Sequence, residues 1–260
     1  MMMRLSAVSR RQALQLLAGG AAWTAGAGPA LAGESRIERL IVEARVYDHI
    51  SQRIDYISNA LRGSRYRGYT LIGGPYRPEK FVVRDDGFDC VTFCETVLAA
   101  AIARNFAEFE PRLREIRYHN GVVNWYERNH YFFEWSRHNV ENKLCRVIAM
   151  DGAVEIEKTV HWHRALGKRR FSMLGIPGAV FLANKNMLMN GDIVGFVTRR
   201  PNLDYFHVGF VALTASGDLL LRHASQSRHR VLDERMDHFA AVNHVSYVTL
   251  LRPVDAPAAV

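Results

Sequence analysis

The chain of 260 residues is 48% hydrophobic and 23% charged, which supplies apolar material for one sizeable core and little for a second. Its net charge of +8 at pH 7 favours anionic partners. The arginines are spread along the chain, and no basic stripe interleaved with aromatic residues is present, so the composition argues against a nucleic-acid partner. We therefore expect one globular domain that does not bind nucleic acid.

Residues 1–32 have the pattern of a signal peptide that is cleaved on export. Arg10 and Arg11 precede an apolar stretch, and the segment closes on the small-x-small sequence Ala30-Leu31-Ala32. A membrane anchor is the alternative, but several glycines and a proline in the stretch weaken a helix. We expect residues 33–260 to form a single catalytic domain without stable membrane insertion, and the mature net charge to be about +5.

The paired arginines resemble a twin-arginine signal, the type that exports proteins already folded. The chain is therefore expected to fold in the reducing cytoplasm and to act in the periplasm. This bears on Cys90, Cys94 and Cys145, because an odd number of cysteines cannot form a complete set of disulfides. At least one thiol is expected to remain free.

Helical patterns dominate the start of the mature chain. Between Arg36 and Leu61 apolar residues recur every three to four positions, which predicts one long amphipathic helix ending at Gly63. Glycine and proline break any periodicity over residues 65–80, which predicts a loop. An apolar face over residues 90–104 predicts a second, buried helix.

In the later part of the chain the predicted elements change from helices to strands. Residues 106–185 are predicted to be a specificity insertion, in which helical stretches give way to short strand-like runs. Four short apolar strands are predicted after this insertion, over residues 192–198, 207–213, 219–223 and 245–251. Ser216-Gly217-Asp218 is expected to form the turn between the middle two. Helices followed by an antiparallel meander indicate the α+β class.

Cys90 stands at the predicted start of the second helix. Backbone N–H groups and the positive end of the helix dipole at such a position stabilise a thiolate and lower its pKa. The same N–H groups can hold an oxyanion. An inert buried cysteine is the alternative explanation when this residue is considered alone.

Two histidines fall on neighbouring predicted strands. His207 opens one strand and His223 lies near the end of the next, so a hairpin brings both side chains to one face. Gly209 leaves room on that face for another backbone to approach. A nucleophile needs a base within hydrogen-bonding reach, and the base needs a polar group that fixes its tautomer. Together with Cys90, the two histidines supply such a set.

The segments around these residues resemble a known family. Phe88-Asp89-Cys90-Val91-Thr92-Phe93, Gly191-Asp192-Ile193-Val194, His207-Val208-Gly209-Phe210 and His223-Ala224-Ser225 follow the motif order of the NlpC-type, papain-like peptidoglycan hydrolases. The resemblance implies a papain-like α+β fold, with Cys90 as nucleophile, His207 as general base and His223 as the residue that orients it. It also implies a reaction that needs no cofactor.

Within that superfamily the chain is more similar to a branch of longer, amidase-like members. The matching segments are Thr92-Phe93-Cys94-Glu95 and Arg128-Asn129-His130-Tyr131-Phe132, with Trp135 and Asn139 downstream. Cys94 departs from the usual aliphatic residue and is expected to be a buried core thiol, since a disulfide to Cys90 one helical turn away would be strained.

The resemblance also implies residues that contact substrate. A tyrosine in a Pro-Tyr turn ahead of the cysteine lines the site in the superfamily, and Gly74-Pro75-Tyr76 matches that turn. Asp89, Arg128 and His130 are the other substrate-binding residues expected from the matched segments.

These features predict an exported enzyme that cuts the amide bond between N-acetylmuramic acid and L-alanine in peptidoglycan or muropeptides. Two alternatives stay open: an endopeptidase that cuts after D-glutamate in the stem peptide, and a wall-binding protein without activity. His161-Trp162-His163 has the spacing of two metal ligands on one strand face. No third ligand is evident beside it, so no metal site is predicted.

Overall fold

Residues 35–161 and 163–255 are described by a computed structural model, and the predicted signal peptide over residues 1–32 lies outside them. Helices precede strands along the chain, and the predicted α+β class is confirmed. The helices are α1 (Arg36–Ala44), α2 (Ile50–Ala60), α3 (Cys90–Ile102), α4 (Phe106–Arg117), α5 (Phe132–Glu141), α6 (Gly178–Ala183) and α7 (Met236–Val242), with short 3-10 turns η1 (His119–Gly121), η2 (Trp125–Glu127), η3 (Arg164–Leu166) and η4 (Lys185–Met187).

The strands form one large curled sheet and a separate hairpin. Neighbours in the large sheet run in the order β4-β1-β11-β10-β9-β8-β12-β7-β6, with β5 also paired to β12, and all pairs are antiparallel except β1 with β4. The strands are β1 (Arg65–Tyr66), β4 (Gly87–Phe88), β5 (Cys145–Ile148), β6 (Val154–Val160), β7 (Arg169–Pro177), β8 (Ile193–Val197), β9 (Tyr205–Leu213), β10 (Leu219–Ser225), β11 (Arg230–Arg235) and β12 (Tyr247–Pro253); the hairpin is β2 (Ile72–Gly74) and β3 (Arg77–Lys80).

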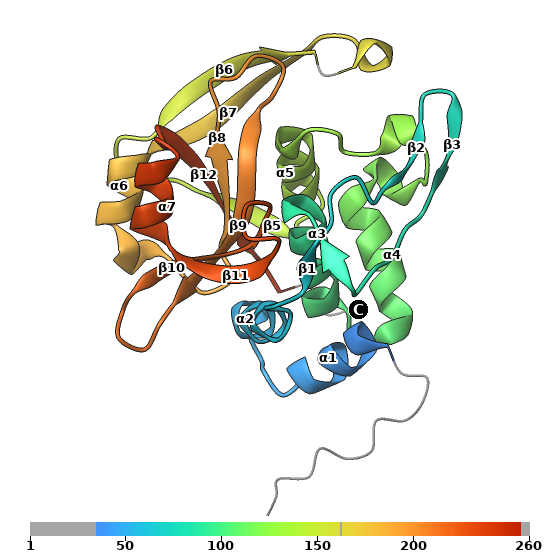
Figure 1. The fold of residues 1–260 in the computed structure, drawn as a ribbon, viewed down its shortest axis with the longest axis horizontal. Helices are drawn as coiled ribbons and strands as arrows, with labels where there is room; N and C mark the ends of the chain where they lie inside the picture. The colour runs from blue at the N-terminus through green and yellow to red at the C-terminus, as the bar shows by residue number, and fades with distance from the viewer. Residues whose placement is uncertain (1–34, 162, 256–260) are drawn as a thin grey trace, which may run out of the picture. The chain divides into compact units, whose positions relative to one another are not determined.

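Helices cover both faces of this sheet. Figure 1 shows α3 to α5 on one side of the strands, and α6 and α7 on the other. Successive residues of a strand face opposite sides, so Phe210 of β9 joins the core under α3 whereas Val211 joins the core under α7. Within the residues described, no helix is both long enough and apolar enough to span a membrane.

The single long helix predicted from Arg36 to Leu61 is wrong, because the structure has two helices there. Both turn their apolar faces to the same core, so the periodicity continues across the break. Arg53 holds the connection in place, since its buried guanidinium donates to the carbonyls of Tyr47 at 3.1 Å and Asp48 at 2.8 Å. These bonds satisfy backbone groups that a continuous helix would have paired internally.

The four strands predicted after residue 190 are present, with ends that differ by one or two residues. The turn before β10 closes with Thr214 N–H donating to Asp218 O at 3.0 Å, and Gly217 there has φ +81°. The loop predicted over residues 65–80 instead holds β1, β2 and β3, and neither β11 nor α7 is predicted from the sequence pattern. β1 pairs with β11, far away in the chain, whereas β2, β3 and β11 belong to hairpins whose residues show no apolar alternation, so local periodicity is a poor guide to these strands.

The Gly191-Asp192 motif anchors the strand beside the candidate site. Asp192 is buried and accepts two bonds from the guanidinium of Arg252, at 2.7 and 2.8 Å, which tie β8 to β12. Gly191 has φ +83°, and a Cβ there would lie 3.0 Å from Ile54 of α2. Glycine therefore permits both the turn and the close approach of α2.

Candidate active site

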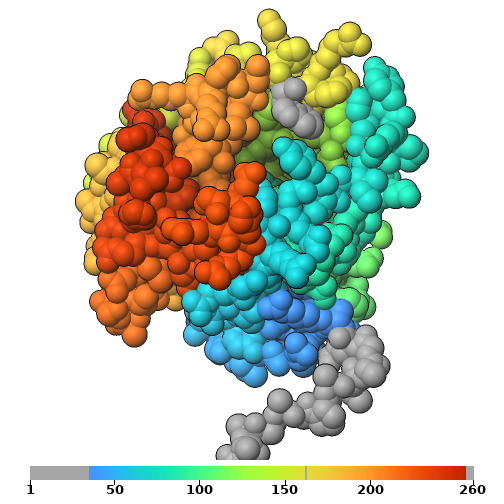
Figure 2. Space-filling view, viewed as in Figure 1, coloured from blue at the N-terminus to red at the C-terminus, as the bar shows by residue number. Residues whose placement is uncertain are grey.

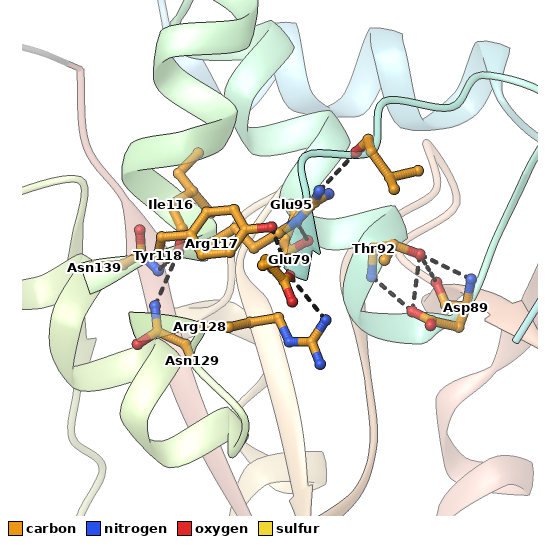
Figure 3. Close-up of polar contacts among 11 residues, drawn as sticks. Glu79, Asp89, Thr92, Glu95, Ile116, Arg117, Tyr118, Arg128, Asn129 and Asn139 are labelled. Atoms are coloured by element: carbon orange, nitrogen blue, oxygen red, sulfur yellow. Dashed lines mark hydrogen bonds and ion pairs between the residues drawn. The ribbon is translucent and has the colours of Figure 1, made fainter. Parts of the chain in front are cut away.

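Cys90 is the first residue of α3, as the sequence predicted. The helix begins there because Asp89 caps it: the Asp89 carboxylate accepts from the Thr92 N–H at 2.8 Å, and the Thr92 hydroxyl accepts from the Asp89 N–H at 3.0 Å (Figure 3). This reciprocal pair satisfies backbone donors at the helix start. It fixes the position of the thiol relative to the sheet.

The thiol lies where two strands of the sheet separate. β9 and β10 pair from Leu213 with Leu219 to Phe210 with Arg222, and their pairing stops there although both strands continue. Beyond that point the backbone N–H of Val208 donates a hydrogen bond to the Cys90 sulfur. The sulfur thus contacts β9 at the residue that follows His207 in the sequence.

The pKa of Cys90 differs from the sequence-based expectation. The residue is half-buried, and enclosure of its sulfur raises the pKa to about 12. The Asp89 carboxylate adds to the rise, whereas the N–H groups of Val208, Cys90 and Val91 oppose it. The expectation of a lowered pKa is therefore wrong for this state, because desolvation outweighs the helix-start N–H groups. The thiol is protonated at neutral pH and needs a base.

His207 and His223 meet on one face of the sheet, as predicted, with 2.6 Å between His207 Nε2 and His223 Nδ1. Phe239 of α7 packs against both rings. Burial, together with the smaller effect of the nearby His223, lowers the pKa of His207 to about 3. Burial lowers the pKa of His223 to about 4, against the opposing charge of Asp233. Both imidazoles are therefore neutral at pH 7.

The pairing of the histidines leaves one nitrogen of His207 available. No hydrogen bond among the described residues involves His207 Nδ1, and none joins it to the Cys90 sulfur. His207 and Val208 are consecutive, so the sulfur that Val208 contacts and the His207 ring both lie at the end of the β9–β10 pairing.

Gly209 gives the two histidines room to meet. A Cβ at this position would lie 2.9 Å from the Arg222 carbonyl oxygen and 3.0 Å from the His223 Cβ. The close approach predicted from the sequence is thus confirmed, and the approaching backbone is that of β10.

Replacing Gly209 with alanine is expected to lower the free energy of unfolding by about 1–3 kcal/mol, because the new methyl group overpacks the β9–β10 contact. Urea denaturation measures this change. Gly74→Ala is the matched control, since a Cβ there meets Arg77 only at an ordinary 3.9 Å. Equal stability of the two variants would contradict the packing described.

Two hollows lie at the candidate site, one lined by Cys90 and the other by the two histidines. A pocket of about 530 Å³ is lined by Cys90, Asp89 and residues of the 66–71 and 128–130 segments. A second hollow of about 330 Å³ is lined by His207, His223 and Phe239, and Gln226 borders both. In Figure 2 the cyan segment that includes β1 lies against the orange C-terminal strands, which agrees with the pairing of β1 and β11.

Three of the four expected substrate-binding residues line the Cys90 pocket: Asp89, Arg128 and His130. Arg128 donates to a Glu79 carboxylate oxygen at 3.0 Å (Figure 3). The His130 ring contacts the Trp125 carbonyl at 2.7 Å, and burial lowers the pKa of His130 to about 4.

The expectation for Tyr76 is not met. This side chain projects from the turn between β2 and β3, is 86% exposed, and does not line the pocket. Tyr66 of β1 lies there instead: burial raises its pKa to about 12, and Cys90 and Asp89 add to the rise. The sequence does not indicate Tyr66, because its pattern predicts a loop over residues 65–80, where no side-chain direction can be assigned.

A buried ion pair lies beside the Cys90 pocket, which Glu95 helps to line. Glu95 of α3 and Arg117 of α4 are each 2% exposed, and Arg117 Nε donates to Glu95 Oε2 at 2.8 Å (Figure 3). Arg117 also donates to the Val82 carbonyl at 2.7 Å, which fixes the chain leading to Cys90. Burial raises the pKa of Glu95, and Arg117 opposes that rise. Apart from Glu95 in a matched segment, no sequence pattern indicates this pair.

The other cysteines and histidines form no second centre in the described part of the chain. Cys94 and Cys145 are buried, and none of the three cysteines forms a disulfide. Over residues 35–161 and 163–255, no three His, Cys, Asp or Glu side chains are grouped so as to hold a metal ion. His163 packs against Trp125 and accepts from the Ala165 N–H at 3.1 Å.

The fold places the molecule in a class of α+β proteins with solved structures. A Legionella pneumophila protein of the DUF1460 family model has a TM-score of 0.72 at 22% identity, over 84% of this chain and 93% of that one. An N-acetylmuramoyl-L-alanine amidase from Bacteroides uniformis has a TM-score of 0.69 at 21% identity, over 78% of this chain and 98% of that one. A putative xylanase from Bacteroides fragilis has a TM-score of 0.61 at 21% identity, over 75% of this chain and 97% of that one. At these identities the likeness establishes the fold alone.

The sequence itself matches a family model over residues 56–244. The chain belongs to this AmiA-like family, described as N-acetylmuramoyl-L-alanine amidase-like. No curated protein shows significant sequence similarity to it. The match covers the capped helix start, both histidines and the segment that contains Arg128.

Proposed function

We propose that this protein is an exported cysteine hydrolase that cleaves the amide bond between N-acetylmuramic acid and L-alanine in peptidoglycan or muropeptides. One observation carries the proposal: a thiol at a capped helix start contacts β9 at Val208, the residue next to His207 of a hydrogen-bonded histidine pair. Membership of an amidase-like family supplies the substrate class. The papain-like arrangement of Cys90, His207 and His223 and the periplasmic location belong to this proposal.

The mechanism starts from a neutral thiol and a neutral imidazole. His207 takes the proton of the Cys90 thiol as the sulfur attacks the amide carbonyl, and backbone N–H groups at the start of α3 stabilise the oxyanion. Collapse of this intermediate breaks the C–N bond, and the imidazolium of His207 donates its proton to the leaving amine of L-alanine. Water then attacks the thioester, with His207 again as base, and releases the muramoyl carboxylate.

The acid limb of the pH profile follows from the histidine pKa. His207 must be neutral to act as base, and burial lowers its pKa to about 3, so kcat/KM should persist as pH falls from 7 to 5. A decline centred near the ordinary histidine value of about 6.5 would contradict the buried neutral base. Initial rates over pH 4 to 8 measure the profile.

Each pH needs a check that the protein is folded. His130, His207 and His223 all have folded-state pKa values below the unfolded value, so the unfolded chain binds more protons once the pH falls below about 6.5. Stability therefore decreases in that acid range. Circular dichroism at each pH separates loss of structure from protonation of the base.

Digestion of purified muropeptides with the mature protein tests the bond assignment. Mass spectrometry should find a disaccharide that has lost its whole peptide, together with an intact peptide beginning at L-alanine. Products cut after D-glutamate would identify the alternative endopeptidase. No cleavage of either bond, with retained binding to cell wall, would favour a wall-binding protein.

A further inference from the structure

Behind the histidine pair lies a carboxylate that the proposed mechanism does not use. Glu234 of β11 places its Oε2 at 3.4 Å from Nε2 of His223, on the side of the ring away from His207. This Nε2 is buried, and its geometry to Glu234 falls short of a hydrogen bond. Glu234 itself is only 24% exposed. A buried ring nitrogen without a hydrogen-bond partner therefore lies 3.4 Å from a carboxylate oxygen.

Two other titratable side chains, Asp233 and His238, lie near Glu234. Its neighbour Asp233 binds Arg222 at 2.7 and 3.0 Å and Arg62 at 3.2 Å. On α7, the exposed His238 places Nε2 at 3.9 Å from the second carboxylate oxygen of Glu234. Phe239, also on α7, packs edge-on against the His223 ring, which restrains its rotation.

This geometry decides which nitrogen of each histidine carries the proton. A carboxylate accepts hydrogen bonds and does not donate them, so it favours a proton on His223 Nε2. His223 is neutral, so its Nδ1 is then an acceptor and the 2.6 Å contact takes its proton from His207 Nε2. The lone pair of His207 is left on Nδ1. In the opposite tautomer, the lone pair of His223 Nε2 would face the carboxylate, and His207 Nδ1 would be protonated.

We propose that Glu234 is a positioning residue that fixes the tautomers of His223 and His207 so that His207 Nδ1 accepts the proton of the Cys90 thiol. This inference rests on the proposed function, in which His207 is the base. It extends the site from three residues to a chain of four that runs from α3 across β9 and β10 to β11.

Nitrogen-15 NMR tests the tautomers without any need for catalysis. In Cys90→Ala protein, the long-range proton–nitrogen correlations of His223 should show a proton on Nε2, and those of His207 should also show a proton on Nε2. Glu234→Leu in the same background should convert His223 to a mixture of tautomers. Protonation of His223 on Nδ1 when Glu234 is present would overturn the proposal.

Kinetics on the otherwise native protein provide the second test. Glu234→Leu is expected to lower kcat by roughly tenfold to a hundredfold with KM little changed, the range typical of partners that orient a functional side chain. Glu234→Gln should recover most of the activity, because its side-chain oxygen still accepts from Nε2–H. Asp237→Asn is the matched control, since this exposed carboxylate nearby on α7 pairs with Arg235.

The outcomes separate the two proposals. Unchanged kcat in Glu234→Leu would overturn the positioning role even if Cys90 proves essential. Activity that survives loss of Cys90 would overturn the proposed function, whereas the NMR result would still report whether Glu234 sets the tautomers.

Discussion

Replacing Cys90 with alanine is expected to lower the rate of amide cleavage by roughly ten-thousandfold or more, as removal of a covalent nucleophile does in other hydrolases. No second thiol can substitute, because Cys94 and Cys145 are buried and line neither hollow of the site. The measurement is the initial rate of muropeptide cleavage by purified protein, with folding checked by circular dichroism.

Cys94→Ala is the matched control for this loss. Cys94 lies one helical turn along α3 and is fully buried, so the variant should be less stable but should keep its activity. If the Cys94 variant loses activity as completely as the Cys90 variant, the effect reflects damage to α3 and the assignment of the nucleophile fails.

Replacing Arg117 with alanine is expected to lower the free energy of unfolding by about 3–5 kcal/mol, the largest effect on stability that we expect from a single substitution. The change leaves the Glu95 carboxylate buried without its ion partner and frees the Val82 carbonyl. Urea denaturation followed by fluorescence measures the difference.

The double variant Glu95→Leu/Arg117→Met distinguishes the unpaired charge from lost packing. Removing both charges replaces the buried pair with apolar side chains of similar volume, which should restore most of the stability lost by Arg117→Ala. If the double variant is as unstable as the single one, the ion pair itself contributes the stability and our account of the penalty is wrong.

The sequence was sufficient for the parts of the site that depend on local pattern. The start of α3 at Cys90 follows from a capping residue directly before an apolar helical face. The meeting of His207 and His223 follows from strand alternation and one turn, with Gly209 marking the close approach. Each inference needs only residues that are near one another in sequence or joined by one hairpin.

The predictions that were wrong or missing mostly concern features that depend on contacts between residues far apart in the chain. The break between α1 and α2 is held by Arg53, whose partners include the Ala101 carbonyl 48 residues away. The rise in the Cys90 pKa comes from enclosure by the folded chain, which no helix-start rule includes. The placement of Tyr66 depends on the pairing of β1 with β11. Glu234 is joined to His223 by the β10–β11 hairpin, and it was not predicted because residues 230–235 lack the apolar alternation of a strand.

The mass of the acyl-enzyme tests the central claim most directly. Rapid acid quenching of the protein with a muropeptide should trap a thioester on Cys90 whose added mass is that of the sugar with its lactyl group and no amino acid. The bond assignment would be contradicted by an adduct that carries L-alanine and D-glutamate. The cysteine mechanism would be contradicted if cleavage proceeds with no adduct at Cys90 and persists in Cys90→Ala.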